Sequence, residues 1–345
     1  MLDFKGKYFR FLIAGVFLGG LVVIWLAYPL FGKIAKSDLS RTEFFISTGS
    51  TFDDVVSGLE SRNYIGSRAD FTKAAWILRY KNENIRPGRY VLNKEMTYLD
   101  LVRKLRSGNQ DAVSVVLNNV RTIEELAGKS EQYFEADSLQ MISYLKDTAV
   151  CRSLGLTADK ILTLFIPNTY EMYWTTTPEK FVSRMKSEYE KYWSEERLSR
   201  ITAIGLDPPG AYIMASIVEK ETNYNPEKPA IAGVYMNRLR SGMKLQADPT
   251  VVFALKKFDL KRVLYEHLTY DSPYNTYMYE GLPPGPICMP SMASLEAVVN
   301  MQEHKYMFFC ATPDYSGKHA FAVTYGEHLK NARIFSNWLD SQNIK

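Results

Sequence analysis

The stretch PPGAYIMASIVEKET, residues 208–222, decides how the second half of the chain is predicted to fold. Asp207 and the two prolines after it are typical of a helix start, because proline fits the first helical turn. Apolar residues then recur at intervals of three and four, which predicts a largely apolar helix over 210–222. The spacing places Glu221 on the apolar face of this helix, whereas Glu219 falls on a different side.

A carboxyl group on an apolar helix face is a candidate proton donor. Burial disfavours the charged form and raises the pKa, so Glu221 could remain protonated near neutral pH. A protonated carboxyl can give its proton to the bridging oxygen of a glycosidic bond, as a general acid. Taken alone, the residue favours a salt-bridged core acid or an acid at an exposed last turn. Its neighbourhood favours the catalytic interpretation, which predicts an enzyme acting on sugar polymers.

Segments downstream of this helix carry polar side chains suited to binding such a polymer. A second helix is predicted over 230–240, with Asn237 near its end. The stretch LQADPTV, residues 245–251, is predicted to be extended and bears Gln246 and Asp248. Stiff loops follow, and loops often carry binding residues. The predicted substrate-binding residues in these loops are Tyr274, Asn275, Thr276 and Tyr277.

Together and in this order, these segments resemble the YceG-like family, the endolytic murein lytic transglycosylases. The resemblance runs from an N-terminal apolar segment to the region 317–328. Asn168 is a departure, since the family often has an acid at this position before Thr-Tyr, and we give Asn168 no catalytic role. The most specific stretches of the resemblance are residues 216–222, 237–239, 245–250, 274–277 and 281–287.

The resemblance implies cleavage of the β-1,4 bond between N-acetylmuramic acid (MurNAc) and N-acetylglucosamine (GlcNAc) inside peptidoglycan glycan strands. A single Glu would act first as acid and then as base. The 6-hydroxyl of the sugar would displace the leaving group and produce a 1,6-anhydroMurNAc end. Neither a metal nor an organic cofactor is expected. The family is linked to ending nascent strands beside the cell-wall synthesis machinery, which is therefore an expected partner.

The identity of the acid stays open between two residues. Lysozyme-like transglycosylases carry their acid before Ser or Thr, as in Glu221-Thr222, and the helical spacing agrees. Alignment with other wall-lytic folds would favour Glu219. We therefore predict Glu221 as the catalytic residue and keep Glu219 as the alternative.

Residues 11–31, FLIAGVFLGGLVVIWLAYPLF, contain no charged residue and are long enough to span a bilayer as a helix. A cleavable signal peptide has a shorter apolar core and a small-residue cleavage site, which this stretch lacks. We therefore predict an uncleaved transmembrane helix over 11–32 and a cytoplasmic tail at 1–10. Three basic residues precede the span and two, with an acid close by, follow it. The predicted location is the cell (inner) membrane, single-pass, with the catalytic domain periplasmic or otherwise extracytoplasmic.

The part after the span is predicted to be α+β, in two domains. Residues 42–108 alternate strand and helix signals, and this small subdomain resembles the LysM-like subdomain found ahead of a wall-cleaving domain. LysM modules bind glycan chains, although a spacer would explain the pattern equally well. Residues 109–345 would form the larger mixed α+β catalytic domain, with a strand at 113–117 and one long surface helix over 178–198.

Composition and sequence motifs argue against several other classes of function. Apolar residues make up 46% and charged residues 23% of the chain, as in globular proteins, and the net charge of +4 does not suggest nucleic-acid binding. The four histidines form no zinc pattern, and no serine-hydrolase elbow or phosphate loop occurs. The three cysteines are predicted to be buried small apolar residues. The rivals are a peptidoglycan-binding scaffold without activity and a lysozyme-type muramidase, which needs a second carboxylate such as Asp248.

Overall fold

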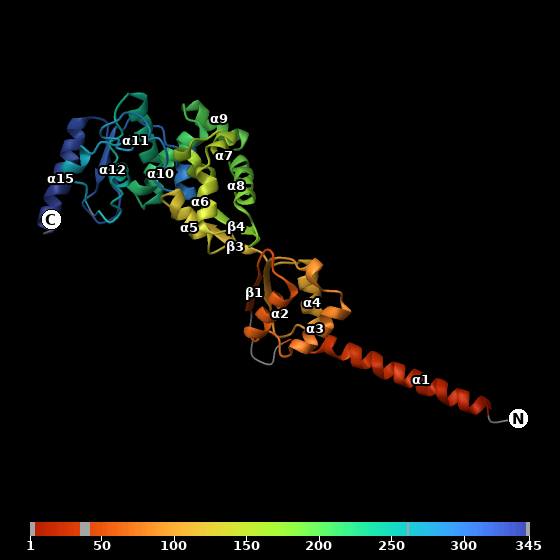
Figure 1. The fold of residues 1–345 in the computed structure, drawn as a ribbon. Helices are drawn as coiled ribbons and strands as arrows, with labels where there is room; N and C mark the ends of the chain where they lie inside the picture. Colours follow the sequence, from red (N-terminus) through yellow and green to blue (C-terminus); the bar gives the residue numbers. More distant parts are fainter. Residues whose placement is uncertain (1–3, 35–41, 261, 343–345) are drawn as a thin grey trace. The chain divides into compact units, whose positions relative to one another are not determined.

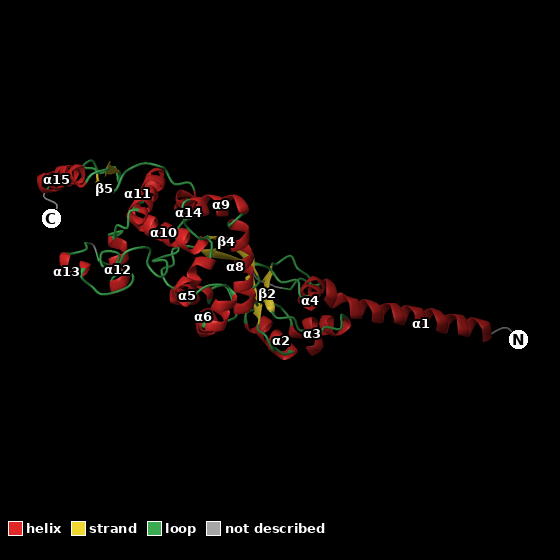
Figure 2. Cartoon of the chain, turned by 90° about the horizontal axis from the view of Figure 1, so that it is seen from above, coloured by secondary structure: helices red, strands yellow, loops and turns green. Residues whose placement is uncertain are grey.

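The computed structural model describes residues 4–34, 42–260 and 262–342, and the chain divides into two compact units (Figure 1). The first unit takes residues 1–114 with the short segments 133–135 and 171–176, and the second takes the remainder. The predicted α+β class is confirmed, since helices predominate among the described residues and strands pair in twos (Figure 2). The pairs are β1 (Thr42–Ile46) with β2 (Gly88–Leu92), β3 (Val113–Leu117) with β4 (Asn168–Met172), and β5 (Phe308–Ala311) with β6 (His319–Ala322).

The first unit begins with an apolar helix, α1 (Phe4–Ala27), which continues into a 3₁₀ turn, η1 (Tyr28–Phe31). Among the described residues, one helix is long and apolar enough to cross a membrane, over Leu12–Phe31. This range overlaps the predicted span, and a signal sequence would show the same feature. The topology prediction counts Lys33 and Lys36, with Asp38 close by, after the span; of these, Lys36 and Asp38 lie outside the described residues.

The rest of the first unit follows the predicted alternation of strands and helices. Its order is β1, α2 (Phe52–Ser61), α3 (Arg68–Ile77), a short 3₁₀ turn, β2 and α4 (Tyr98–Ser107). The side chains of Thr51 and Thr97 cap α2 and α4 in capping boxes, as their positions in the sequence indicate. The sheet is antiparallel and packs with the helices around a core that includes Phe44, Leu59, Phe71, Tyr90 and Leu101.

The helices before the centre of the second unit correct one prediction. The long helix expected over 178–198 is two helices, α8 (Pro178–Tyr192) and α9 (Glu195–Ala203). Trp193 leaves helical geometry, and the side chain of Ser194 accepts a hydrogen bond from the backbone N–H of Arg197, which starts a new helix. Before them lie α5 (Ile123–Ser130), α6 (Ser138–Lys146) and α7 (Thr148–Ser153).

The predicted helix at 210–222 is confirmed as α10 (Pro208–Glu221), the buried centre of the second unit. Asp207 caps its first turn, and residues 210–218 are buried throughout. It packs against α11 (Lys228–Arg240), which confirms the second predicted helix, and against α14 (Met292–Val299). The unit ends with β5, β6 and α15 (Tyr325–Ser341).

The prediction of an extended stretch over 245–251 is wrong from Asp248 onward. Asp248 is the first residue of a helix, α12 (Asp248–Leu255), which is followed by α13 (Tyr265–Leu268). The following proline explains the difference, because proline is well suited to the first turn of a helix.

Of the cysteines, Cys151 and Cys288 are buried and Cys310 is half-buried, and all are free.

Candidate active site

Glu221 is the last residue of α10, and its carboxyl is enclosed by protein while part of the side chain remains open to solvent. Burial raises the pKa of this carboxyl to about 7, and the negative charge of Asp248 acts in the same direction. The hydroxyl of Tyr235 on α11 donates a hydrogen bond to Oε1, and the positive charge of Arg238 is near, so both act in the opposite direction. Burial is the largest of these effects, and the carboxyl can therefore hold a proton at neutral pH.

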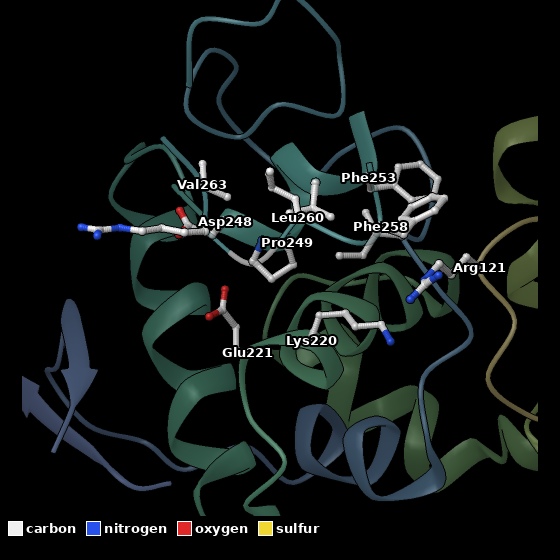
Figure 3. Close-up of a pocket in the computed structure, with 12 residues that line it drawn as sticks. Arg121, Lys220, Glu221, Asp248, Pro249, Phe253, Phe258, Leu260 and Val263 are labelled. Carbon is white, nitrogen blue, oxygen red and sulfur yellow. The ribbon is translucent and has the colours of Figure 1, made fainter. Parts of the chain in front are cut away.

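The carboxyl of Glu221 opens onto a pocket of about 480 Å³. In Figure 3 it points across the pocket toward Pro249 and Asp248, at the start of α12. Lys220 lies beside it, and an aromatic wall closes one side of the pocket (Figure 3). The other lining residues are Arg121, Val252, Phe253, Phe258, Leu260, Arg262, Val263 and Ile287.

Several residues that line the pocket belong to no recognisable sequence motif. The guanidinium of Arg121 lies over the ring of Phe258, 4.5 Å from its centroid. Phe253 packs against Phe258 with ring centroids 6.2 Å apart and against Tyr274 at 4.8 Å. Arg121 comes from just before α5, a hundred positions ahead of Glu221 in the chain. The pocket thus combines aromatic faces and cationic groups around one raised-pKa carboxyl.

Glu219, the alternative acid, is directed at a different element. Its Oε2 accepts hydrogen bonds from the hydroxyls of Ser291 (2.6 Å) and Ser294 (2.5 Å), and from Nζ of Lys228 (3.0 Å). Burial works against its charge, but these hydrogen bonds outweigh burial and lower the pKa of Glu219. Glu219 does not line the pocket, and its carboxylate joins the start of α14 to α10.

The predicted loop 274–277 packs on the turn before α12. The hydroxyl of Tyr277 donates a hydrogen bond of 2.6 Å to Oδ1 of Asp248. The hydroxyl of Thr276 accepts one from the backbone N–H of Ala247 at 3.0 Å, and its carbonyl accepts one from the N–H of Gln246 at 3.1 Å. These bonds hold the first turn of α12, and with it Asp248, at the pocket. Gln246 itself is exposed, with a left-handed φ of +50°.

Asn275 and Asn237 use their amides within the protein. The amide nitrogen of buried Asn275 donates to the carbonyl oxygens of Leu268 (3.0 Å) and Tyr270 (2.7 Å). That of Asn237 donates to the carbonyl oxygens of His304 (2.8 Å) and Tyr306 (3.0 Å). Neither residue lines the pocket, whereas the structure brings Glu221 and Asp248 together there.

Arg238 is a buried cation that the sequence analysis did not assign to the site. Its Nε donates to the carbonyl oxygen of Met307 at 2.7 Å, and its Nη1 donates to that of Leu245 at 2.6 Å. Its guanidinium also lies over the ring of Phe308. These contacts fix the chain just before α12, and the positive charge favours the ionised form of Glu221.

No group of three or more His, Cys, Asp or Glu side chains in the described ranges is arranged to hold a metal ion. His319 is instead bonded to Glu227, with Nδ1 and Oε2 2.9 Å apart. The raised pKa of Glu221 suits acid–base chemistry, and the pocket beside it has room for a polar ligand.

Comparisons with known proteins find relatives over most of the chain. The endolytic murein transglycosylase of Bacillus subtilis (strain 168) is 28% identical over 355 residues, which cover 97% of this chain and 93% of the relative. The endolytic murein transglycosylase of Streptococcus pneumoniae serotype 2 (strain D39) is 26% identical over 322 residues, which cover 83% of this chain and 57% of the relative.

Among solved structures, the crystal structure of a YceG-like protein from Listeria monocytogenes matches with a TM-score of 0.55 and 28% identity. The match covers 84% of this chain and 99% of the Listeria chain. The model of the YceG-like family matches residues 44–334, a range that includes the whole pocket around Glu221. The chain therefore belongs to the YceG-like family.

Proposed function

We propose that the chain is an endolytic peptidoglycan lytic transglycosylase that cleaves MurNAc–GlcNAc β-1,4 bonds within glycan strands and produces 1,6-anhydroMurNAc ends. The observation that carries the proposal is the carboxyl of Glu221, which opens onto the pocket and has a pKa of about 7. The names of the curated relatives, endolytic murein transglycosylases, support the same activity.

In the proposed reaction, protonated Glu221 donates its proton to the glycosidic oxygen as the bond between this oxygen and C1 of MurNAc breaks. The resulting carboxylate accepts the proton of the C6 hydroxyl of the same sugar, and O6 forms the new bond to C1. No water is consumed, and Glu221 ends the cycle protonated. A pKa near 7 suits both steps, because the same group must give and take a proton at one pH.

Glu221 is a better candidate than Glu219 for this role. The lowered pKa of Glu219 keeps its carboxylate ionised at neutral pH, so it has no proton to donate. Its Oε2 is also occupied by two serine hydroxyls and Lys228. Glu221 has a raised pKa and a free path to the pocket.

The walls of the pocket supply the proposed substrate contacts. The rings of Phe253 and Phe258 offer apolar faces for sugar rings, and Arg121 offers a cation for anionic groups of the substrate. Asp248 and the exposed Gln246 are proposed to bind hydroxyl or amide groups of the glycan. The loop residues Tyr274, Asn275, Thr276 and Tyr277 are proposed to hold the walls and the start of α12 in place. Asn237 is proposed to hold residues 304–306 against α11.

The test is digestion of intact peptidoglycan by the full-length chain in detergent, with products identified by mass spectrometry. Anhydro-ended fragments that disappear in Glu221→Gln are expected. Glu219→Gln is the matched control two residues away, and it should still form them. Full activity of Glu221→Gln would refute the assignment of the acid. Binding without cleavage by the wild type would instead identify a scaffold.

A lysozyme-type muramidase is the second candidate function, because Asp248 lies in the same pocket and its charge acts on Glu221. A hydrolase of this kind needs a second carboxylate to act as nucleophile or to activate water. It would yield reducing ends in place of anhydro ends, so the same mass spectra distinguish the two reactions.

The domain organisation is also proposed. Residues 11–32 would anchor the chain in the cell (inner) membrane, with 1–10 in the cytoplasm and the remainder outside it. The strand–helix–helix–strand order of the first unit supports a LysM-like subdomain at 42–108, ahead of a catalytic domain at 109–345. A catalytic domain held at the membrane would reach nascent strands beside the cell-wall synthesis machinery, whose termination is the proposed role.

A further inference from the structure

The apolar helix of the first unit is built into the fold that follows it. The turn η1 packs against α3 and α4, and Leu30 of this turn joins the core of the unit. Ile34 is fully buried, and its backbone N–H donates a hydrogen bond of 3.1 Å to the carbonyl oxygen of Met96. The packed core of the unit therefore starts directly at the end of α1, with α3 beside the last turns of this helix (Figure 1).

A groove of about 550 Å³ lies between the end of α1 and α3. One wall belongs to the apolar helix and its turn, and the other belongs to α3 and the residues just after it. The indole of Trp76 on the second wall is 74% exposed, which is unusual for a side chain of this size. The lining residues are Val23, Ala27, Leu30, Trp76, Ile77 and Arg79.

Arg79 lines this groove, and Lys73 lies in a neighbouring hollow that shares Trp76 with it; neither has an acidic partner among the described residues. The Nζ of Lys73 donates a hydrogen bond of 2.9 Å to the carbonyl oxygen of Trp25 and lies 3.1 Å from the centroid of its indole ring. Arg79 is exposed, just past the end of α3. Within residues 4–34, 42–260 and 262–342, no carboxylate lies within ion-pair distance of either side chain. The groove is thus apolar inside, with one cation at its edge and a second in the neighbouring hollow.

Exposed aromatic side chains also lie at the end of the apolar segment, on the turns that include the groove residues Val23, Ala27 and Leu30. Trp25, Tyr28 and Phe31 are 67%, 78% and 67% exposed, and Trp76 joins them from α3. Trp and Tyr gather where a membrane meets water, because their rings prefer the apolar side while their polar atoms stay hydrated. Trp76 lies more than forty residues beyond the span, so only the fold adds it to this belt. One wall of the groove belongs to the proposed membrane span and would be surrounded by lipid. A glycan in the groove would therefore compete with this lipid.

We propose that the groove between α1 and α3 is a membrane-interface site for anionic phospholipid, in which Trp76 and Ile77 contact acyl chains and Arg79 binds the phosphate, while Lys73 in the neighbouring hollow adds a second positive charge at the same surface. The inference rests on the proposed membrane span. It assigns the face of α3 next to α1 to lipid, so the first unit lies against the bilayer surface.

The depth of Trp76 can be measured in the full-length chain, reconstituted into phosphatidylcholine vesicles whose acyl chains carry bromine, a contact quencher of tryptophan fluorescence. The difference between wild type and Trp76→Phe isolates the emission of Trp76. This emission should be quenched by lipid brominated near the headgroup. Trp193 is buried in the second unit, and its emission, isolated with Trp193→Phe, should not be quenched. Unquenched emission of Trp76, or a change caused by soluble glycan fragments alone, would overturn the proposal.

The choice of lipid tests the charges. The chain is reconstituted into vesicles that contain both phosphatidylglycerol and phosphatidylcholine. Native mass spectra count the lipids that remain bound to the chain, and phosphatidylglycerol should be retained in preference to phosphatidylcholine. Arg79→Gln and Lys73→Gln should each lower this preference by about fivefold, the amount that one basic residue contributes at an anionic surface. Arg240→Gln removes an exposed charge from the second unit and should leave the preference intact. An equal loss in Arg240→Gln would show unspecific attraction and refute the site.

A wash of the vesicles with alkaline carbonate separates this proposal from the one on which it rests. A chain that is washed off has no membrane span, and both proposals fail. A chain that stays while Trp76 remains unquenched has a span but no interface site, and only the present inference fails. The activity on peptidoglycan is measured separately and is expected to survive Trp76→Phe.

Discussion

The hydroxyl of Tyr235 on α11 donates a hydrogen bond to Oε1 of Glu221 at the end of α10. This bond favours the ionised form of Glu221, whereas burial of the same carboxyl favours the neutral form and has the larger effect. The balance leaves the pKa of Glu221 near 7, so small changes around the carboxyl should move its protonation through the neutral range.

Tyr235→Phe should raise the pKa of Glu221 and move the alkaline limb of the pH–rate profile to higher pH. A hydrogen bond to a charged group contributes about 1.5–3 kcal/mol, which corresponds to roughly one to two pKa units. The profile of kcat/KM for anhydro-product formation checks this. Tyr279→Phe, which removes an exposed hydroxyl bonded to Asp271, is the control. An alkaline limb that stays in place in Tyr235→Phe would contradict the role of the bond.

Asp248→Asn should have the opposite effect on the same profile. The charge of Asp248 raises the pKa of Glu221, so its removal should shift the alkaline limb to lower pH. The shift should be less than about one unit because Asp248 is exposed and water screens its charge. The amide oxygen can still accept the hydrogen bond from Tyr277. A loss of activity as deep as that of Glu221→Gln would favour the muramidase mechanism.

Glu221→Gln should make the chain more stable above pH 7. The pKa of Glu221 is raised from 4.5 to about 7, so the folded chain keeps a proton that the unfolded chain releases. The stability that the neutral carboxyl contributes is full below pH 4.5 and is lost as pH rises through about 7. Since glutamine cannot ionise, the variant should gain about 2 kcal/mol at alkaline pH and little at acidic pH. Urea unfolding at both pH values measures this, and a gain that is independent of pH would contradict it.

Glu219→Ala should destabilise the second unit by about 3 kcal/mol. The change leaves the charge of Lys228, which is 3% exposed, without its partner, and it frees the start of α14. Because the pKa of Glu219 is lowered, its contribution is present at neutral pH and is lost as pH falls through the folded-state pKa. The difference in the free energy of unfolding between the wild type and Glu219→Ala should therefore disappear at acidic pH.

The control for Glu219→Ala is Glu196→Ala, which breaks an exposed ion pair with Arg200. Exposed pairs contribute less than about 1 kcal/mol, so thermal unfolding of this variant should change little. Equal destabilisation by both substitutions would show that the network around Glu219 has no special weight.

Gly233→Ala should destabilise the chain by about 1–3 kcal/mol, the usual cost of overpacking. A Cβ at Gly233 on α11 would lie 2.4 Å from the carbonyl oxygen of Gln302 and 2.6 Å from Nε2 of His304. Gly326→Ala on α15 meets nothing within 4 Å and should be neutral or stabilising. If both variants unfold at the temperature of the wild type, the close approach of α11 to Gln302 is wrong.

Local signals predict most helix positions of this chain. Thr51, Thr97 and Asp207 each cap the helix that the pattern places after them, because capping and the first turn involve neighbouring residues only. Periodicity alone predicts one helix over 178–198. The helix instead ends before Trp193, because Ser194 caps the start of a second helix there. The extended interpretation of 245–251 fails for a related reason, since Pro249 permits a helix start as readily as an extended chain.

The sequence by itself determined that α10 is an apolar helix and that Glu221 lies on its apolar face, because helical periodicity is a property of consecutive residues. Only the tertiary structure decided what each carboxylate meets. Glu219 is bound by α14, Glu221 receives the hydroxyl of Tyr235, and Arg121 reaches the pocket from a hundred positions upstream. The pKa of a carboxyl depends on the groups around it in space, and packing brings these groups together from distant parts of the chain.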